Sequence, residues 1–250
     1  MAAEYWLDDA AWAAIEPLLP RNQPGARRVD DRRVISGIVH VLRSGCRWKD
    51  CPAIYGPPTT IYNRWNRWSA RGLWMRIFHA LADVRPADVA MIDSSAVKAQ
   101  RASADGKGGA AAQAIGRSRG GRTTKTHAIA DGQGRPRVFL LSPGNIADIT
   151  VAPDLLRMAP PCRVFLGDQG YDARALREQA ARAGALVVIP NNPTRRNPHP
   201  FDASRYGARN AIERMFCRLK DYRRIATRYD RLARNFASAV ALVSAITWWI

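Results

Sequence analysis

Four polar residues near the C-terminal end are spaced in a way that suits chemistry on phosphodiesters. They follow the pattern Tyr206-x2-Arg209-x3-Glu213-x6-Lys220. On a helix of about 100° per residue their side chains fall within about 60° of arc and share one face. The opposite face, which we predict to pack in the core, carries Ala208, Ala211, Ile212, Met215 and Leu219. A carboxylate for a metal ion, with cations beside it for phosphates, is what phosphodiester chemistry requires.

Two aspartates that follow short apolar runs are candidate partners of Glu213. Asp93 ends the run that starts at Val89, and Asp168 comes just after the run that starts at Val164. Each run has the length of a buried strand, and open α/β sheets place ligands at the carboxyl ends of parallel strands. A single aspartate there is more often a turn former or a helix cap, which is the role predicted for Asp172. Two strand-end aspartates followed by a helical glutamate indicate a divalent-cation site, since several oxygens must converge on such an ion.

These residues belong to a longer set of motifs. The supporting segments are Arg47–Asp50, Pro57–Trp65, Gly116–His127, Gly144–Asp148 and Gly167–Asp172. In this set the chain resembles the DDE transposases of bacterial insertion sequences, and in particular the insertion sequence five family. The resemblance covers nearly the whole chain, and the Tyr-Arg-Glu-Lys spacing is its specific part. It implies an RNase H-like catalytic core that cleaves DNA at transposon ends and joins those ends to target DNA.

The resemblance also implies a role for each candidate residue. Two Mg²⁺ ions, for which Mn²⁺ can substitute, would be bound by the three carboxylates Asp93, Asp168 and Glu213. Arg209 and Lys220 would hold the scissile or flanking phosphates. Tyr206 would either orient Arg209 or stack on an unpaired base. The implied partners are double-stranded DNA, as transposon ends and target, and further copies of the chain, in a homodimer or higher oligomer that pairs two ends.

The charge of the chain indicates a polyanionic partner. Lys and Arg number 39 against 21 Asp and Glu, which gives a formal net charge of +18 and a pI near 10.9. The cations are clustered, unlike those of a protein that is basic only for solubility. Beyond the segment 206–220, the candidate DNA contacts are Arg117, Arg119, Arg122, Lys125, Arg195 and Arg196. The Gly-rich segment 103–122 lacks the Gly-Lys-Ser/Thr ending of a phosphate-binding loop, so no nucleotide cofactor is expected.

The sequence predicts neither a membrane protein nor a secreted one. Residues 1–5 lack the basic start and apolar run of a signal peptide, and the apolar stretch 237–250 is shorter than a membrane span needs. No C-x-x-C pair is present among Cys46, Cys51, Cys162 and Cys217, which favours reduced thiols over a zinc site. We therefore expect a cytoplasmic, nucleoid-associated bacterial protein.

The N-terminal third predicts helices. Candidate N-caps are Asp8 or Asp9, Asp30 or Asp31, and Thr59 or Thr60, and Gly45 is a candidate C-cap. One face of the third helix carries the residues spaced i, i+3, i+4 and i+7, which are Thr60, Asn63, Arg64 and Arg67. Such side chains can reach base edges and phosphates, and a polar helix after a turn suggests a helix-turn-helix reader of DNA. The alternative is an ordinary bundle of three or four helices with a solvated charged face.

Beyond residue 85 strands and helices alternate. Strands are predicted at Val89–Asp93, Thr124–Asp131, Arg137–Leu141, Val164–Leu166 and Leu186–Ile189. The first three predict an antiparallel meander, and the last two, with a helix at Ala173–Ala183, predict a β-α-β unit. The predicted architecture is α/β: an RNase H-like catalytic core at 86–250, with a mixed five-stranded sheet and helices, preceded by an all-α helix-turn-helix domain at 1–85.

Two other functions stay open at this stage. A catalytically silent DNA-binding regulator descended from a transposase would keep the basic helices but would not need three acidic residues. An RNase H-type nuclease or resolvase would share the metal site, but it would need neither the N-terminal reader nor the 206–220 segment. The intact set of acidic and basic residues favours the transposase.

Overall fold

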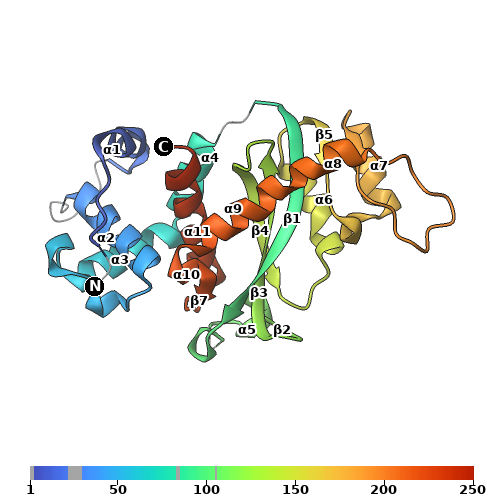
Figure 1. Ribbon diagram of the computed structural model, residues 1–250. Helices are drawn as coiled ribbons and strands as arrows, with labels where there is room; N and C mark the ends of the chain where they lie inside the picture. Colours follow the sequence, from blue (N-terminus) through green and yellow to red (C-terminus); the bar gives the residue numbers. More distant parts are fainter. Residues whose placement is uncertain (1–2, 22–29, 83–84, 105) are drawn as a thin grey trace. The chain divides into compact units, whose positions relative to one another are not determined.

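The computed structural model describes residues 3–21, 30–82, 85–104 and 106–250 (Figure 1). Packing divides the chain into two units. The helical unit comprises Met1–Ala82 together with Leu219–Ile250, and the sheet unit comprises Asp83–Arg218. The predicted division at residue 85 therefore differs from the structure at the C-terminal end, because residues 219–250 pack with the N-terminal helices.

The helical unit consists of α-helices, short 3-10 helices and one two-residue strand. Its elements are α1 (Asp9–Ile15), η1 (Glu16–Leu18), α2 (Asp31–Ser44), η2 (Trp48–Asp50), η3 (Ala53–Tyr55), α3 (Pro58–Ala70), α4 (Leu73–Leu81), α10 (Arg223–Ala226), β7 (Thr227–Arg228) and α11 (Ala233–Trp248). Asp8 and Asp30 accept hydrogen bonds from main-chain amides of the first turns of α1 and α2, as N-caps do. The predicted Thr cap of α3 is wrong: the helix begins at Pro58, whose fixed φ suits a first helical position and whose missing N–H needs no cap.

Two contacts show why the C-terminal residues belong to the helical unit. The amide of Asn235 in α11 donates to the amide oxygen of Asn66 in α3 at 3.2 Å. At the end of α2, Gly45 has a φ of 76°, and a Cβ added there would lie 2.8 Å from the Cβ of Arg223. Gly45 is thus required both by its left-handed backbone, as the predicted C-cap, and by this close approach. A fragment of residues 1–85 would lose both contacts.

The connection between α2 and α3 is longer than the three- or four-residue turn of a typical helix-turn-helix. It spans residues 45–57 and contains η2 and η3. The region is helical, as predicted, but its polar helix α3 is joined by a tight turn to the following helix α4 rather than to α2. Three tryptophans pack around that turn: the ring centroids of Trp65 and Trp68 lie 5.5 and 5.3 Å from that of Trp74.

The sheet unit contains the predicted mixed sheet. Its strands are β1 (Ala87–Ala99), β2 (Gly116–Ser118), β3 (Gly121–Asp131), β4 (Pro136–Pro143), β5 (Cys162–Leu166) and β6 (Leu186–Val188). Apart from the short β2, the strands of this unit lie in the order β4-β3-β1-β5-β6. Neighbours among β4, β3 and β1 are antiparallel, and neighbours among β1, β5 and β6 are parallel. This is the predicted meander followed by a β-α-β unit, and it confirms the RNase H-like sheet. The short β2 adds a hairpin at the start of β3.

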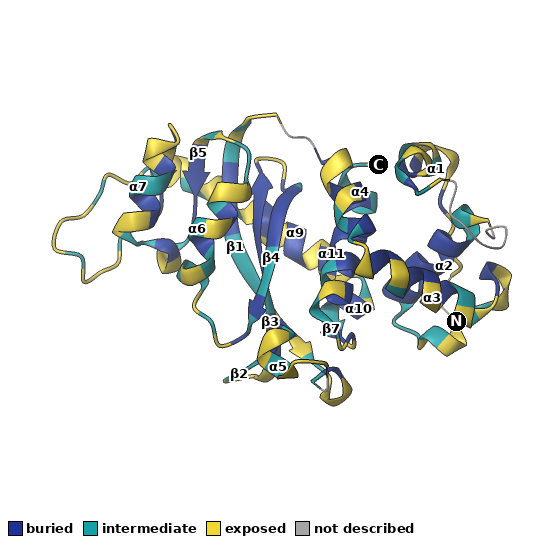
Figure 2. Ribbon diagram, turned by 180° about the vertical axis from the view of Figure 1, so that it is seen from behind, coloured by how far each residue is buried: buried dark blue, intermediate teal, exposed yellow. Residues whose placement is uncertain are grey.

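Helices cover both faces of this sheet (Figures 1 and 2). The remaining elements are η4 (Arg101–Ser103), α5 (Gly109–Ala112), α6 (Asp148–Met158), η5 (Gln169–Tyr171), α7 (Arg174–Arg182), α8 (Ala203–Tyr206), η6 (Gly207–Arg209) and α9 (Asn210–Lys220), whose last two residues are counted with the helical unit. On one face α6 and α7 bury Leu155 and Leu176 against Ile92 and Phe165 of the central strands. The segment α8-η6-α9 lies on the other face, toward which Asp93 points because side chains alternate along a strand.

No helix in the described part of the chain is long and apolar enough to cross a membrane. All four cysteines are free thiols.

Candidate active site

Asp93 and Asp168 lie at the same level of two neighbouring parallel strands. Met91 of β1 pairs with Leu166 of β5, and each aspartate comes two residues later in its own strand direction. The charge of Asp168 acts on the Asp93 carboxylate, which places the two carboxylates near each other. The expectation that both follow strand ends holds only for Asp168. β1 continues past Asp93 to Ala99, since Asp93 and the residues after it pair with β3.

Main-chain amides orient both carboxylates. The Ser94 N–H donates to Asp93 Oδ1 at 2.7 Å, and the Gly170 N–H donates to Asp168 Oδ1 at 2.8 Å. Asp168 therefore caps the turn η5 that follows β5. These bonds fix the direction of each carboxylate and use one oxygen of each.

The segment that carries Tyr206, Arg209 and Glu213 is helical but not one continuous α-helix. α8 ends at Tyr206, the 3-10 turn η6 ends at Arg209, and α9 carries Glu213. The predicted inner face is buried at Ala211, Ile212, Met215 and Leu219, whereas Ala208 is exposed because it lies in the turn. Gly134, in the turn after β3, approaches this segment so closely that an added Cβ would lie 2.7 Å from the Ala211 carbonyl oxygen.

Arg209 joins the helical segment to the sheet. Its guanidinium donates to Asp93 Oδ2 at 3.0 Å and to Glu213 Oε1 at 2.5 Å. The same guanidinium lies 5.8 Å from the centroid of the Tyr206 ring. Arg209 thus makes the spatial connection between the helical glutamate and the sheet aspartate that sequence spacing could not show.

Burial and charge act in opposite directions on these groups. Burial raises the pKa of Asp93, and the charge of Asp168 adds to this, while the Ser94 amide and Arg209 lower it; the net shift is upward. Burial lowers the pKa of Arg209, but the negative charges around it, Asp93 first, raise it overall. The site therefore gathers negative charge that one arginine only partly neutralises.

The donor chemistry fits a hard divalent cation, although the carboxylates are not yet gathered around one point. Within the described residues, no three His, Cys, Asp or Glu side chains are close enough together to hold a metal ion. The oxygens Asp168 Oδ2 and Glu213 Oε2 have no hydrogen-bond partner among the described residues, and Asp93 Oδ2 is bound only by Arg209. Carboxylate oxygens are the ligands that Mg²⁺ prefers, so the chemistry of these three side chains fits this ion.

Some of the other candidate DNA contacts are exposed to solvent, and others are already bound to groups within the fold. Arg117, Arg119 and Arg122 are exposed on the β2–β3 hairpin, where Arg117 and Arg122 are cross-strand neighbours. Lys220 is exposed at the last residue of α9. Lys125, in contrast, is half-buried and donates to Asp148 Oδ1 and to the Ile146 carbonyl oxygen, both at 2.9 Å. The positive charge of Lys125 is therefore paired with Asp148 inside the fold.

The polar face of α3 is likewise divided. Asn63 and Arg67 are exposed, and Thr60 is half-buried. Arg64 is buried, forms an ion pair with Asp31 and lies over the Trp68 ring at 4.9 Å. The predicted base-reading role of Arg64 does not fit this position, because a side chain that is paired and covered inside the unit is not available to DNA.

Asp172 is not the helix cap that its position before α7 suggested. The residue before α7 is Ala173, with no side-chain cap, and Asp172 forms ion pairs with Arg177 and Arg195 instead. Sequence reasoning missed this cluster because Arg195 lies 23 residues further along the chain.

Comparison with known proteins identifies the family of the chain. A family model described as "Transposase DDE domain" matches residues 85–248, which include all three candidate carboxylates. The chain therefore belongs to the DDE transposases. A second model, "Putative transposase of IS4/5 family", matches residues 7–78, and it places the chain among the insertion-sequence transposases that the motifs predicted.

Individual relatives are consistent with this assignment. The "Putative transposase for insertion sequence element IS6501" of Brucella ovis is 36% identical over 127 residues, which are 50% of this chain and 98% of that protein. The "Insertion element IS402 uncharacterized 16.2 kDa protein" of Burkholderia cepacia is 38% identical over 107 residues, which are 37% of this chain and 73% of that protein. Among solved structures, the chain is similar to a chain of "Crystal structure of a pre-cleavage Mos1 transpososome". The match covers 89% of this chain and 79% of that chain, at 12% identity and a TM-score of 0.27. A similarity at this level does not support an argument.

Proposed function

We propose that this transposase binds the terminal repeats of its insertion sequence and catalyses metal-dependent cleavage of the DNA strand and its transfer to target DNA. The observation that carries the proposal is the placement of Asp93 and Asp168 at one level of neighbouring parallel strands, with Glu213 linked to Asp93 through Arg209. Three carboxylates on one face of the sheet, with a cation between them, suit phosphodiester chemistry.

Each residue of the site has a proposed role. The oxygens of Asp93, Asp168 and Glu213 would hold two Mg²⁺ ions, or Mn²⁺ in their place. When bound, such ions lower the pKa of an attacking water or hydroxyl group and stabilise the leaving oxygen of an in-line displacement. Arg209 and Lys220 would contact phosphates of the strand, and Tyr206 would hold Arg209 or stack on an unpaired base. Arg209 would exchange its carboxylate partners for phosphate oxygens.

Strand cleavage by single variants of the full chain tests the site. Asp93→Ala, Asp168→Ala and Glu213→Ala should each abolish Mg²⁺-dependent cleavage while specific binding to transposon ends is retained, because the carboxylates are assigned to the metal and not to base recognition. Asp88→Ala is the matched control, since Asp88 is an exposed aspartate on the same strand as Asp93. Ca²⁺ should support binding but little cleavage, because its looser coordination positions the attacking oxygen poorly.

The results separate the alternatives. Substantial cleavage by any one of the three purified variants would remove that residue from the site. A wild-type chain that binds ends but never cuts or joins them would instead be the catalytically silent regulator.

The helical unit is the proposed reader of the transposon ends. Asn63 and Arg67 on α3 are exposed side chains of the types that contact bases and phosphates. The β2–β3 hairpin, with its three exposed arginines, is a second proposed contact with the duplex. Pairing of two ends would require a homodimer or higher oligomer. Because residues 219–250 pack with the reader, binding should be measured on the full chain.

A further inference from the structure

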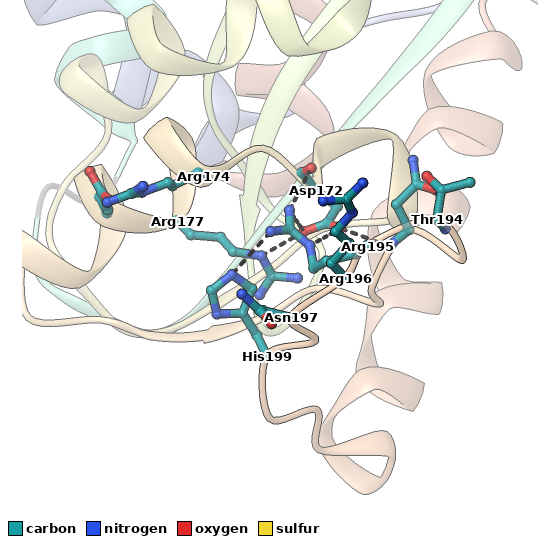
Figure 3. Close-up of a pocket in the computed structure, with 10 residues that line it drawn as sticks. Asp172, Arg174, Arg177, Thr194, Arg195, Arg196, Asn197 and His199 are labelled. Carbon is teal, nitrogen blue, oxygen red and sulfur yellow. Dashed lines mark hydrogen bonds and ion pairs between the residues drawn. The ribbon is translucent and has the colours of Figure 1, made fainter.

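A cationic cavity lies between α7 and the segment after β6 (Figure 3). Its volume is about 740 Å³. Four arginines line it, Arg174, Arg177, Arg195 and Arg196, against two carboxylates, Asp172 and Glu178. The remaining lining residues are Asn192, Thr194, Asn197 and His199. The cavity thus offers an excess of two positive charges and many hydrogen-bond donors.

A buried carboxylate builds this cavity. The Asp172 side chain is 1% exposed and accepts from Arg177 Nε at 2.7 Å, from Arg195 Nη2 at 2.8 Å and from the Asn192 N–H at 2.7 Å. Burial raises its pKa, but the hydrogen bonds from Arg195, Asn192 and Arg177 outweigh this and bring it to about 2. Asp172 is therefore ionised at neutral pH and anchors both walls.

The segment after β6 is held in place by its own hydrogen bonds as well. The side chain of Asn191 donates to the His199 carbonyl oxygen at 2.9 Å and accepts from the His199 N–H at 2.8 Å. Arg177 also donates to the Ile189 carbonyl oxygen, at 2.7 Å, from the opposite wall. These hydrogen bonds connect the two ends of the segment to each other and to α7.

The anchoring leaves cationic donors facing the cavity. Arg196 is exposed and has no hydrogen-bond or ion-pair partner among the described residues. Arg174 is also exposed and binds only Glu178. In Figure 3, Arg174 lies on one side of the cavity and Arg195 and Arg196 on the other. Guanidinium groups prefer ligands with paired acidic oxygens, which they can bind through two parallel hydrogen bonds.

We propose that this cavity binds a backbone phosphate of the DNA strand, an inference that rests on the function proposed above. Asp168 caps the turn η5, and Asp172 follows the same turn directly. One 3-10 turn thus connects the candidate metal ligand to the anchor of the cavity. A phosphate bound by Arg196 and Arg174 would hold the strand at a fixed offset from the reacting phosphodiester. Asp172 is a positioning residue, because it acts through Arg195 and the segment it holds.

The test is the affinity of the full-length Arg196→Ala variant for a transposon-end duplex, in Ca²⁺ and over a range of salt concentrations. Loss of one charged hydrogen bond should weaken binding about 10-fold at low salt. The slope of log K against log salt should become shallower by about 0.9, which is the effect of one lost phosphate contact. Arg196→Lys should restore the slope and part of the affinity. Asp172→Asn should weaken binding in the same direction, with folding checked by thermal unfolding.

Arg157→Ala is the matched control. Arg157 is an exposed arginine of the same unit, on α6, and it does not line the cavity. Equal affinities and equal salt slopes for Arg196→Ala and Arg157→Ala would overturn the proposal, as would weaker binding with an unchanged slope. If either result is found while the wild-type chain cleaves transposon ends in a parallel assay with Mg²⁺, the proposed function stands and only the cavity has been misassigned. A wild-type chain that binds no DNA would refute both.

Discussion

Arg209 occupies the position between Asp93 and Glu213 where a divalent cation would be needed, so removing it should have two opposite effects. A metal ion that binds Asp93 Oδ2 must displace the Arg209 guanidinium, which lies 3.0 Å from that oxygen. In Arg209→Ala no cation has to leave. We therefore expect tighter Mn²⁺ binding in the absence of DNA, together with slower strand transfer, because the same guanidinium is the proposed contact to a phosphate.

The size of the effect follows from the exposure of the partners. The Arg209 and Asp93 side chains are 16% and 18% exposed, so their bond is partly shielded from water. Glu213 is 52% exposed, so its ion pair with Arg209 contributes little free energy. A charge-assisted hydrogen bond of this kind contributes about 1.5–3 kcal/mol. Since about 1.4 kcal/mol is a factor of ten, the Kd for Mn²⁺ should fall about 10- to 100-fold.

Two measurements on the same preparation check this prediction. Free Mn²⁺ is titrated by electron paramagnetic resonance without DNA, and joining of pre-cleaved ends is followed in a single turnover. Arg205→Ala is the control for net charge, because Arg205 is an exposed neighbour paired with Asp202 rather than with the site. Arg209→Lys should recover only part of the joining rate, since the bidentate fork is lost. Unchanged or weaker Mn²⁺ binding in Arg209→Ala would refute the idea that Arg209 competes with the metal.

Two further predictions concern the folded state. Arg64→Ala should lower the free energy of unfolding, measured in urea, by about 1.5–3 kcal/mol, because it removes the charged hydrogen bond to Asp31 and the contact with the Trp68 ring. Arg67→Ala should leave stability unchanged and weaken DNA binding, because Arg67 is exposed. Equal stabilities for the two variants would contradict the inward assignment of Arg64. His127 is buried, and desolvation, helped by Lys125 and opposed by Asp148, lowers its pKa to about 4. Because the unfolded chain takes up a proton near pH 6.5 and the folded chain does not, stability should fall by about 3 kcal/mol between pH 6.5 and pH 4, and His127→Gln should flatten this profile in thermal unfolding.

The sequence predicted the strands of the sheet because their apolar runs are short and bounded. It misjudged the length of β1, since the polar residues after Asp93 resemble a loop. They extend the strand because they pair with residues 123–127 of β3, a partner that periodicity cannot identify. The break in the helical segment at Gly207 also went unpredicted, because the spacing of Tyr206, Arg209 and Glu213 assumed one regular helix.

The residue types of the candidate site could be selected from the sequence, but its ion pairs could not. Motif order selected the three carboxylates, whereas the partners of the arginines lie far away in the sequence. Arg64 and Arg195 are chemically suited to DNA, but their partners Asp31 and Asp172 lie 33 and 23 residues away. An arginine in a basic chain can either form an ion pair inside the fold or remain exposed to bind a ligand. Only the tertiary structure shows which of the two applies to a given arginine.

The parallel pairing of β1 and β5 has a consequence for how this active site tolerates change. Asp93 and Asp168 each come two residues after Met91 and Leu166, which are partners in the parallel pairing, so we expect substitutions that preserve the two strands to keep the two aspartates at one level. Glu213 lies on a helix and is not placed by strand pairing. Its position depends on how Ile212 and Met215 pack and on the absence of a side chain at Gly134. Two of the three candidate carboxylates are thus placed by the backbone and the third by apolar packing. Substitutions among the hydrophobic residues of α9 should therefore move Glu213 relative to the two aspartates without altering the sheet.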